Sequence, residues 1–175
     1  MDPAPRFITA DSPVGDILIV TVADAVVWLH PAHGSLEHDL ERVALLLRAS
    51  PQPETTDAAA QAAEQLDAYF DGALRMFDVA LDWRFVRGFS RAALEAVCDI
   101  PYGETAGYGE VAIRAGSPRA ARAVGTACAS TPFSLVVPVH RVVRADGSLG
   151  EYGGRPEVKQ FLIDLEQRAD PVFAR

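Results

Sequence analysis

The sequence predicts an α+β fold in two parts, because its secondary-structure pattern changes character near residue 84. The first part combines apolar β-branched runs with two segments of helical periodicity, which indicates a small sheet with helices. The second part is helical from residue 89, and a short turn separates two of its helices. A chain of 175 residues, 49% of them hydrophobic, is long enough to bury a core in one or two small domains.

The N-terminal part, residues 1–84, is expected to contain a β-hairpin near its start. Its strands are the apolar runs 14–22 and 25–29, which Ala23-Asp24 separates. Ser35 is placed to cap a helix whose apolar residues recur at helical spacing, namely Leu36, Leu40, Val43 and Leu47. After a proline-containing loop, residues 57–71 are predicted to form a second helix, and residues 77–83 alternate as a strand.

The C-terminal part comprises residues 85–175. The boundary between the two parts is expected within residues 83–88. A helix is predicted from Phe89 to about residue 100. Thr105 is the expected cap of a short helix over 108–115, which Gly116 ends. Ser117-Pro118 then predicts the start of a helix that runs to about residue 129, so the two helices form a helix-turn-helix. A last helix is predicted after Pro156.

Composition and charge predict a cytoplasmic protein. No run approaches the roughly 18 to 20 apolar residues of a membrane span, and residues 1–6 lack the pattern of a secretion signal. Cys98 and Cys128 are too few for a disulfide framework and lack metal-ligand spacing, so we expect reduced, buried thiols and no metal site. The net charge is −8, distributed as −9 over residues 1–103 and +2 over residues 104–159. This asymmetry fits a DNA-binding module on a scaffold that does not bind, and it equally fits two ordinary solvated faces.

Residues 136–143, Val-Val-Pro-Val-His-Arg-Val-Val, followed by Tyr-Gly-Gly at 152–154, form the most informative motif of the chain. The motif resembles the signature of 6-O-alkylguanine-DNA alkyltransferases, in which a cysteine between the proline and the histidine takes the alkyl group from the damaged base. Here that residue is Val139. Valine has no lone pair and no ionisable proton, so it cannot act as a nucleophile. A second branch of the family, the alkyltransferase-like proteins, also lacks the cysteine and binds alkylated DNA without repairing it.

The resemblance covers nearly the whole chain, strongly for residues 99–166 and weakly before residue 83. It implies an N-terminal α+β domain that resembles ribonuclease H, followed by a winged helix-turn-helix. Residues 116–125 resemble the family's recognition helix, which lies against the minor groove. Arg122 matches the arginine that fills the stack when the damaged nucleotide rotates outward, and Tyr108 matches the tyrosine that presses on the target phosphate. The DNA-binding residues implied are Tyr108, Ala121, Arg122, Gly125 and Arg141. Without the resemblance, a surface arginine and ordinary helix packing would be the simpler interpretation.

His140 and Glu166 match the family's catalytic base and the carboxylate that orients it. Without a nucleophile, this pair also has a structural interpretation, because a buried histidine that is hydrogen-bonded to a carboxylate satisfies both groups. A pocket for the alkylated base is implied after the wing-like turn at 145–148. Its lining residues would be Val137, Val139, Tyr152, Gly153 and Gly154.

The resemblance therefore implies a DNA-repair protein that flips and holds 6-O-alkylguanine in duplex DNA without accepting the alkyl group. One alternative is a methyltransferase inactivated by a cysteine-to-valine change, or one that uses Cys128. Another is a decayed fold with no DNA role. Thr131, Ala92 and Leu94 also depart from the family pattern, which favours natural divergence over a single engineered substitution. The expected partners are double-stranded DNA with alkylated guanine and other repair proteins, with no membrane and no cofactor, and a monomer is expected.

Overall fold

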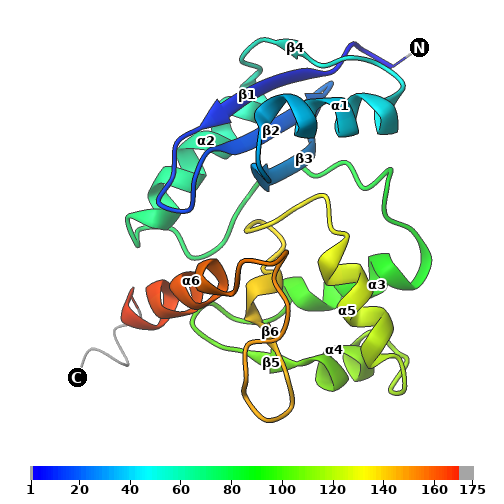
Figure 1. The fold of residues 1–175 in the computed structure, drawn as a ribbon, viewed down its shortest axis with the longest axis vertical. Helices are drawn as coiled ribbons and strands as arrows, with labels where there is room; N and C mark the ends of the chain where they lie inside the picture. Colours follow the sequence, from blue (N-terminus) through cyan, green and yellow to red (C-terminus); the bar gives the residue numbers. More distant parts are fainter. Residues whose placement is uncertain (1, 170–175) are drawn as a thin grey trace. The chain divides into compact units, whose positions relative to one another are not determined.

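A computed structural model describes residues 2–169 of the chain (Figure 1). It contains both helices and strands, so the predicted α+β class is confirmed. The chain divides into an N-terminal unit, Met1–Arg84 with Pro132–Val136, and a C-terminal unit, Phe85–Thr131 with Val137–Arg175. Residues 170–175 of the predicted second domain lie outside the described residues. In the part of the chain that is described, no helix is both long enough and apolar enough to cross a membrane.

The N-terminal unit is built on a four-stranded sheet with the order β3-β2-β1-β4. The strands are β1 (Arg6–Ala10), β2 (Ile17–Val22), β3 (Ala25–Pro31) and β4 (Gln52–Pro53). β2 pairs antiparallel with both β1 and β3, whereas the short β4 runs parallel to β1. Every residue of β2 is buried, as expected for a central strand that is covered on both faces.

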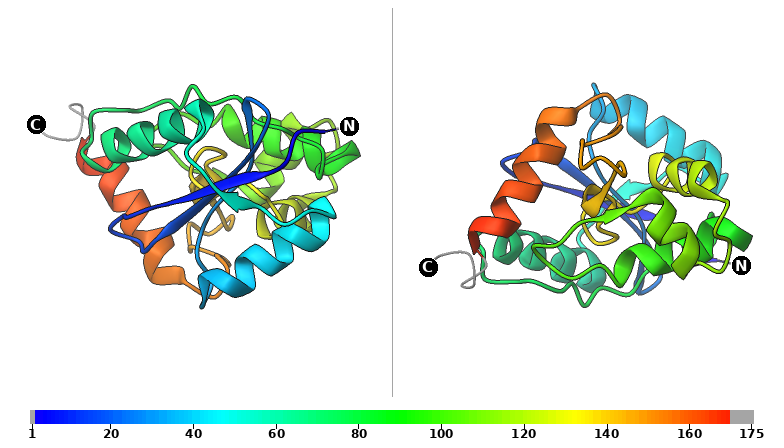
Figure 2. Two further views of the ribbon diagram at one scale, coloured as in Figure 1. Left: turned by 90° about the horizontal axis from the view of Figure 1, so that it is seen from above. Right: turned by 90° about the horizontal axis from the view of Figure 1, so that it is seen from below.

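Two helices of the N-terminal unit, α1 (Leu36–Leu47) and α2 (Asp57–Phe70), lie on opposite faces of the sheet (Figures 1 and 2). Ser35 caps α1 by accepting a hydrogen bond from the His38 backbone at 3.2 Å, as predicted. Thr56 caps α2 in the same way through the Ala59 backbone, also at 3.2 Å. Sequence reasoning did not identify β1, and it began the β2 strand at Val14, which lies instead in a turn.

The predicted strand over residues 77–83 is wrong, because this segment is irregular apart from one bridge between Leu81 and Val26. The side chains of α2 explain the difference. The Gln65 side chain accepts from the Asp78 backbone N–H at 2.8 Å, and the amides of Gln61 and Gln65 both donate to the Asp78 carbonyl. These glutamines satisfy backbone groups that a strand would pair with a neighbouring strand.

Residues 132–136 also belong to the N-terminal unit, although the predicted boundary assigns them to the second domain. The Leu29 backbone donates to the Pro132 carbonyl at 2.9 Å and accepts from the Ser134 N–H at 2.8 Å. The Phe133 ring packs edge-on against Trp83, with 5.2 Å between the centroids. Residues 132–134 therefore pair with the outer edge of β3. In the sequence, this segment interrupts the C-terminal unit.

The C-terminal unit contains α3 (Gly88–Cys98), α4 (Tyr108–Arg114), α5 (Ala121–Ala129) and α6 (Pro156–Ala169). Helices α3, α4 and α5 pack against one another. Two-residue strands, β5 (Ala106–Gly107) and β6 (Val142–Val143), pair in parallel, and the 3-10 helix η1 (Val139–Arg141) directly precedes β6. The predicted pair of short helices joined by a turn is therefore present as α4 and α5.

Two predicted helix starts in this unit are wrong. Thr105 does not cap α4, because the chain continues as β5 and the helix begins only after Gly107, without a side-chain cap. Ser117-Pro118 does not open α5 either. Gly116 adopts a φ of +86°, and the turn closed by the hydrogen bond from the Ala120 N–H to the Ser117 carbonyl delays the helix to Ala121.

Stability should depend on the pH through His30 of β3. Burial lowers the pKa of His30 to about 4, against the raising effect of its hydrogen bond to the Pro31 carbonyl. The unfolded chain binds this proton near pH 6.5, so between pH 6.5 and 4 the unfolded state carries more protons and the folded state loses stability as the pH falls. The His30→Gln variant should flatten this dependence.

The measurement is the free energy of unfolding from urea titrations across this pH range. His38→Gln, at an exposed histidine of α1, is the matched control and should keep the wild-type slope. Equal slopes for wild type and His30→Gln would contradict the assignment.

Candidate functional site

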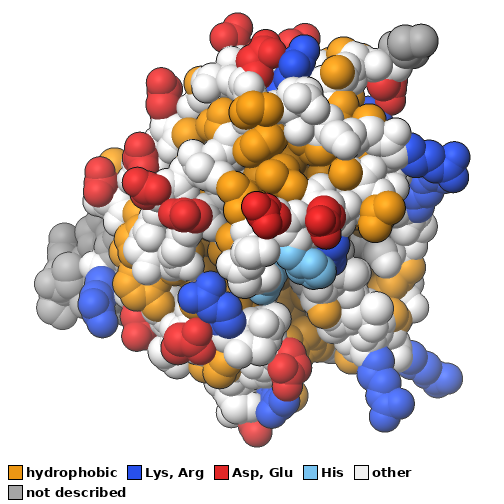
Figure 3. Space-filling model, turned by 45° about the horizontal axis from the view of Figure 1, so that its top comes forward, with side chains coloured by type: hydrophobic (Ala, Val, Ile, Leu, Met, Phe, Trp, Pro, Cys, Tyr) orange, Lys and Arg blue, Asp and Glu red, His pale blue; other side chains and the backbone are white. Residues whose placement is uncertain are grey.

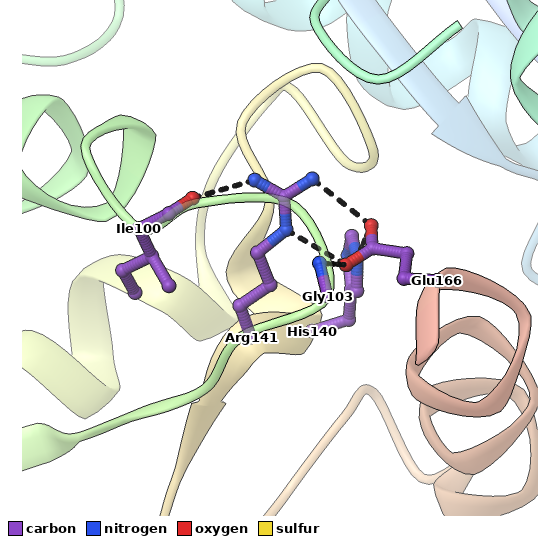
Figure 4. Close-up of polar contacts among 5 residues, drawn as sticks. All are labelled: Ile100, Gly103, His140, Arg141 and Glu166. Carbon is purple, nitrogen blue, oxygen red and sulfur yellow. Dashed lines mark hydrogen bonds and ion pairs between the residues drawn. The ribbon is translucent and has the colours of Figure 1, made fainter. Parts of the chain in front are cut away.

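The centre of the C-terminal unit is a buried ionic network around the carboxylate of Glu166 (Figure 4). The His140 Nε2 lies 2.6 Å from the Glu166 Oε1. Arg141 donates to the same carboxylate twice, from Nε to Oε2 at 2.9 Å and from Nη2 to Oε1 at 3.0 Å. The three side chains come from η1 and α6, so the predicted contact between His140 and Glu166 is present.

The network extends to the loop between α3 and α4. The third guanidinium nitrogen of Arg141, Nη1, donates to the Ile100 carbonyl at 2.7 Å, and the Gly103 backbone donates to the Glu166 Oε2 at 3.3 Å. Figure 4 shows Arg141 and Gly103 bound to the Glu166 carboxylate and Ile100 bound to the other side of the guanidinium. The network therefore fixes η1, α6 and the loop after α3 with respect to one another.

Arg141 does not take the DNA-binding position that the sequence suggested. It is only 7% exposed, and all three guanidinium nitrogens are engaged within the unit. A guanidinium held in this way is not available to a phosphate. The sequence carried a signal for burial, because Arg141 stands in a run whose other members, apart from His140, are valines and a proline.

The charges in this network are set by its environment. Burial raises the pKa of Glu166, but the hydrogen bonds and charges of His140 and Arg141 outweigh it and lower that pKa to about 2. Burial lowers the pKa of His140, against the opposing effect of Glu166. At neutral pH the carboxylate is thus ionised and the imidazole is neutral. Because a carboxylate only accepts, Nε2 must carry the imidazole proton and Nδ1 is the basic nitrogen.

Val139 lies at the start of η1, immediately before His140. It is 5% exposed, and its N–H donates to the Val137 carbonyl at 2.8 Å. Val137 is fully buried, Tyr152 is partly exposed, and Gly153 and Gly154 are exposed with φ values of +55° and +73°. Both glycines therefore adopt a backbone conformation that disfavours other residues. A pocket that these five residues share stays a prediction.

Tyr108, the first residue of α4, lies next to two glycines, Gly125 and Gly150. A Cβ added to Gly125 of α5 would lie 3.8 Å from the tyrosine ring, and one added to Gly150 would lie 3.0 Å from its hydroxyl oxygen. A Cβ at Gly125 would make ordinary van der Waals contact with the Tyr108 ring, so only Gly150 approaches the tyrosine too closely for a side chain. Ala121 is partly exposed.

Arg122 is exposed on α5, and within residues 2–169 its guanidinium makes no ion pair or side-chain hydrogen bond. A cation in this state is available to a phosphate or to a base stack.

The charge asymmetry predicted from the sequence follows the division into units. The N-terminal unit contains 14 acidic and 5 basic residues, a net charge of −9, and the C-terminal unit contains 10 acidic and 11 basic residues, a net charge of +1. Figure 3 shows acidic side chains scattered over the visible face rather than gathered in one cluster. The C-terminal unit is therefore the part of the chain that opposes a polyanion least.

Neither cysteine is placed or activated as a nucleophile would be. Cys128 is partly exposed and Cys98 is exposed, so the expectation of two buried thiols is wrong for Cys98. Desolvation of its sulfur raises the pKa of Cys98 to about 11 and that of Cys128 to about 12. Few of these thiols are thiolates at neutral pH.

Arg141→Met should destabilise the C-terminal unit strongly, because it leaves the Glu166 carboxylate buried without its cation. Breaking a buried pair in this way costs about 3–5 kcal/mol. The control is Arg91→Met, which breaks the exposed pair between Arg91 and Glu95 on α3 and should cost about 1 kcal/mol or less. Urea denaturation measures both. Comparable losses for the two variants would show that the buried network is not important for stability.

Comparison with protein families finds a match to the model described as "6-O-methylguanine DNA methyltransferase, DNA binding domain", over residues 88–168. The chain is 50% identical over 119 residues to the methylated-DNA–protein-cysteine methyltransferase of Mycolicibacterium paratuberculosis, which covers 68% of this chain and 72% of that protein. It is 39% identical over 166 residues to the protein of the same name from Mycobacterium bovis, which covers 94% of this chain and 93% of the relative.

Solved structures agree with the sequence relatives. The crystal structure of Mycobacterium tuberculosis O6-methylguanine methyltransferase is 37% identical, covers 95% of both chains and superimposes with a TM-score of 0.79. The M. tuberculosis OGT crystallised in complex with DNA is also 37% identical, covers 98% of this chain and 97% of its own, and gives a TM-score of 0.77. With similarity at this level along nearly its whole length, the chain belongs to the methylated-DNA–protein-cysteine methyltransferase family.

Proposed function

We propose that this protein binds 6-O-alkylguanine in double-stranded DNA, rotates the damaged nucleotide out of the helix and holds it without accepting the alkyl group. The observation that carries the proposal is Val139, which precedes the His140–Glu166 pair and which the motif resemblance matches to the family's acceptor cysteine. An aliphatic side chain cannot receive an alkyl group by nucleophilic attack, whereas the surrounding groups still hold the site's backbone in place.

DNA binding is supported by the family match and by α5. Residues 88–168 match a DNA-binding domain, and a relative of similar fold was crystallised with DNA. Arg122 is exposed and without a side-chain partner in the described structure, as an arginine that enters a base stack would have to be. We assign the DNA-facing surface to Tyr108, Ala121, Arg122 and Gly125, within a C-terminal domain of residues 85–175 that follows an N-terminal domain of residues 1–84.

The lesion pocket is proposed at Val137, Val139, Tyr152, Gly153 and Gly154. Val139 would supply apolar contact for the alkyl group in place of a sulfur. The two glycines, which are exposed and have positive φ, would let a flipped base approach the backbone closely. We propose that the protein acts in the cytoplasm as a monomer without a cofactor and that other repair proteins act on the DNA it marks.

An inactive form of a methyltransferase is the second candidate. The two methyltransferase relatives described above favour it. Both candidates predict that the wild type accepts no methyl group, because position 139 has no thiol. They differ in whether the damaged base is bound selectively.

Wild-type protein should keep its mass after incubation with duplex containing 6-O-methylguanine. Neither cysteine is a thiolate at neutral pH, and methyl transfer needs a thiolate aligned with the methyl carbon. Intact-protein mass spectrometry is the measurement. Val139→Cys, which places a thiol beside His140, is the positive control and should gain one methyl group. A methyl group on Cys98 or Cys128 of the wild type would disprove the non-catalytic assignment.

The protein should bind duplex containing 6-O-methylguanine more tightly than the same duplex with guanine. The altered pair costs less to open, and the methyl group gains contact with Val139, which together favour the lesion by about tenfold. Titrations at one salt concentration measure the ratio of the two Kd values. Arg122→Ala should weaken binding to the lesion by about tenfold, because the vacated stack is no longer filled.

Arg91→Ala, at the exposed pair on α3, is the matched control for loss of a positive charge. Equal affinities of the wild type for the two duplexes would contradict the proposed lesion binding and leave an inactive methyltransferase or a decayed fold. If Arg122→Ala and Arg91→Ala bind equally well, the assignment of α5 to the DNA surface is wrong.

A further inference from the structure

Lys159 of α6 is the single lysine of the chain, and its side chain is completely buried. Its Nζ donates to the Val142 carbonyl at 2.5 Å and to the Glu151 carbonyl at 3.5 Å. The ammonium also lies 5.8 Å from the centroid of the Tyr108 ring. Lysine is rarely buried to this extent without a carboxylate partner, so the position needs an explanation beyond packing.

The two carbonyls that Lys159 binds lie at the two ends of one turn. Val142 belongs to β6, from which the chain passes through the exposed residues 144–148 and returns to Glu151. The turn is closed by a hydrogen bond from the Arg144 N–H to the Ser148 carbonyl at 2.9 Å. Directly after Glu151 come Tyr152, Gly153 and Gly154. Lys159 therefore holds together the two ends of the segment that leads into the proposed pocket.

The same turn contacts Tyr108. A Cβ at Gly150 would meet the Tyr108 hydroxyl at 3.0 Å, so the turn comes close enough to the tyrosine to crowd a side chain at this position. The Tyr108 ring thus lies near Gly150, Gly125 of α5 and the Lys159 ammonium. A displacement of the turn would release the tyrosine on one side.

Charge makes these contacts stronger than ordinary hydrogen bonds. Burial lowers the pKa of Lys159 to about 8, Cys128 and Glu151 raise it, and Arg144 lowers it. His140 is also close enough to sense the charge of Lys159. At neutral pH the amine is still mostly protonated, and charge-assisted hydrogen bonds to carbonyls are roughly twice as strong as neutral ones.

We propose that Lys159 is a positioning residue, which holds residues 143–151, and through them Tyr108 and the Tyr152–Gly154 segment, in the arrangement that recognition of the alkylated base requires. The proposal rests on the proposed function. Lys159 itself is buried, so it acts through the two carbonyls and not by touching DNA.

The test compares Lys159→Met with Gln160→Met, which places the same side chain at the exposed neighbouring position of α6. Without DNA, limited trypsin digestion should cleave after Arg144 about tenfold faster in Lys159→Met, the effect of losing one charge-assisted hydrogen bond, and at the wild-type rate in Gln160→Met. With DNA, the ratio of the Kd values for guanine and 6-O-methylguanine duplexes should fall toward one only in Lys159→Met. A general loss of stability would weaken binding to both duplexes alike and leave this ratio unchanged.

A second measurement changes the charge of Lys159 by pH in the wild-type protein, so it does not depend on how a Lys159 variant folds. In wild-type protein the Kd ratio should fall between pH 7 and 9, as the amine loses its charge, and Gln160→Met should follow the same profile. An unchanged cleavage rate in Lys159→Met, or an unchanged Kd ratio in a protein whose wild type discriminates, would overturn the positioning role. A wild type that does not discriminate at pH 7 would instead overturn the proposed function, and the positioning role with it.

Discussion

The ionised carboxylate of Glu166 is the interaction on which the C-terminal unit depends. It accepts hydrogen bonds from His140, from two nitrogens of Arg141 and from the Gly103 backbone. A buried charge is costly unless it is paired and its remaining lone pairs are satisfied. Here one guanidinium supplies the opposite charge, and donors from two segments, η1 and the loop after α3, satisfy both oxygens. The positions of η1, α6 and the loop after α3 are consequences of that requirement.

This constraint gives the His140–Glu166 pair a structural role that does not depend on the side chain at position 139. Among the described residues, Glu166 is the only carboxylate paired with the buried Arg141, and His140 binds the same carboxylate. Replacing either residue would leave a charge or a polar group buried and unsatisfied. The structural role is thus sufficient to retain the pair, and its retention is not a sign of catalysis. The proposed lesion recognition therefore depends on the surface around Tyr108 and Arg122.

Sequence reasoning succeeded where local signals and the motif agreed. The Ser35 cap, the α4–α5 pair and the contact between His140 and Glu166 are all present in the structure. It failed where tertiary contacts override local preference. Thr105 and Ser117 have the chemistry of helix caps, yet strand pairing at β5 and the turn after Gly116 decide where the helices begin.

Partners distant in sequence account for the other misses. The segment 77–83 alternates like a strand, but the glutamines of α2 bind the Asp78 backbone, and Ala80 and Asp82 pair with a single residue of β3, Val26. Arg141 carries the right charge for DNA; its apolar neighbours in the sequence indicate burial, but its partner Glu166 lies 25 residues away and no local pattern identifies it. No sequence motif identifies Lys159 as a buried residue. Its importance depends on the placement of two backbone carbonyls, which periodicity does not reveal.

The most direct test of the account is whether the protein extrudes an intact lesion. A duplex with 2-aminopurine beside 6-O-methylguanine becomes more fluorescent when the lesion leaves the stack, and digestion of the recovered strand measures the alkyl group that remains. The account predicts a stable rise in fluorescence on binding, absent with Arg122→Ala, and complete recovery of 6-O-methylguanine. No rise with the wild type, or loss of the methyl group from the DNA, would contradict it.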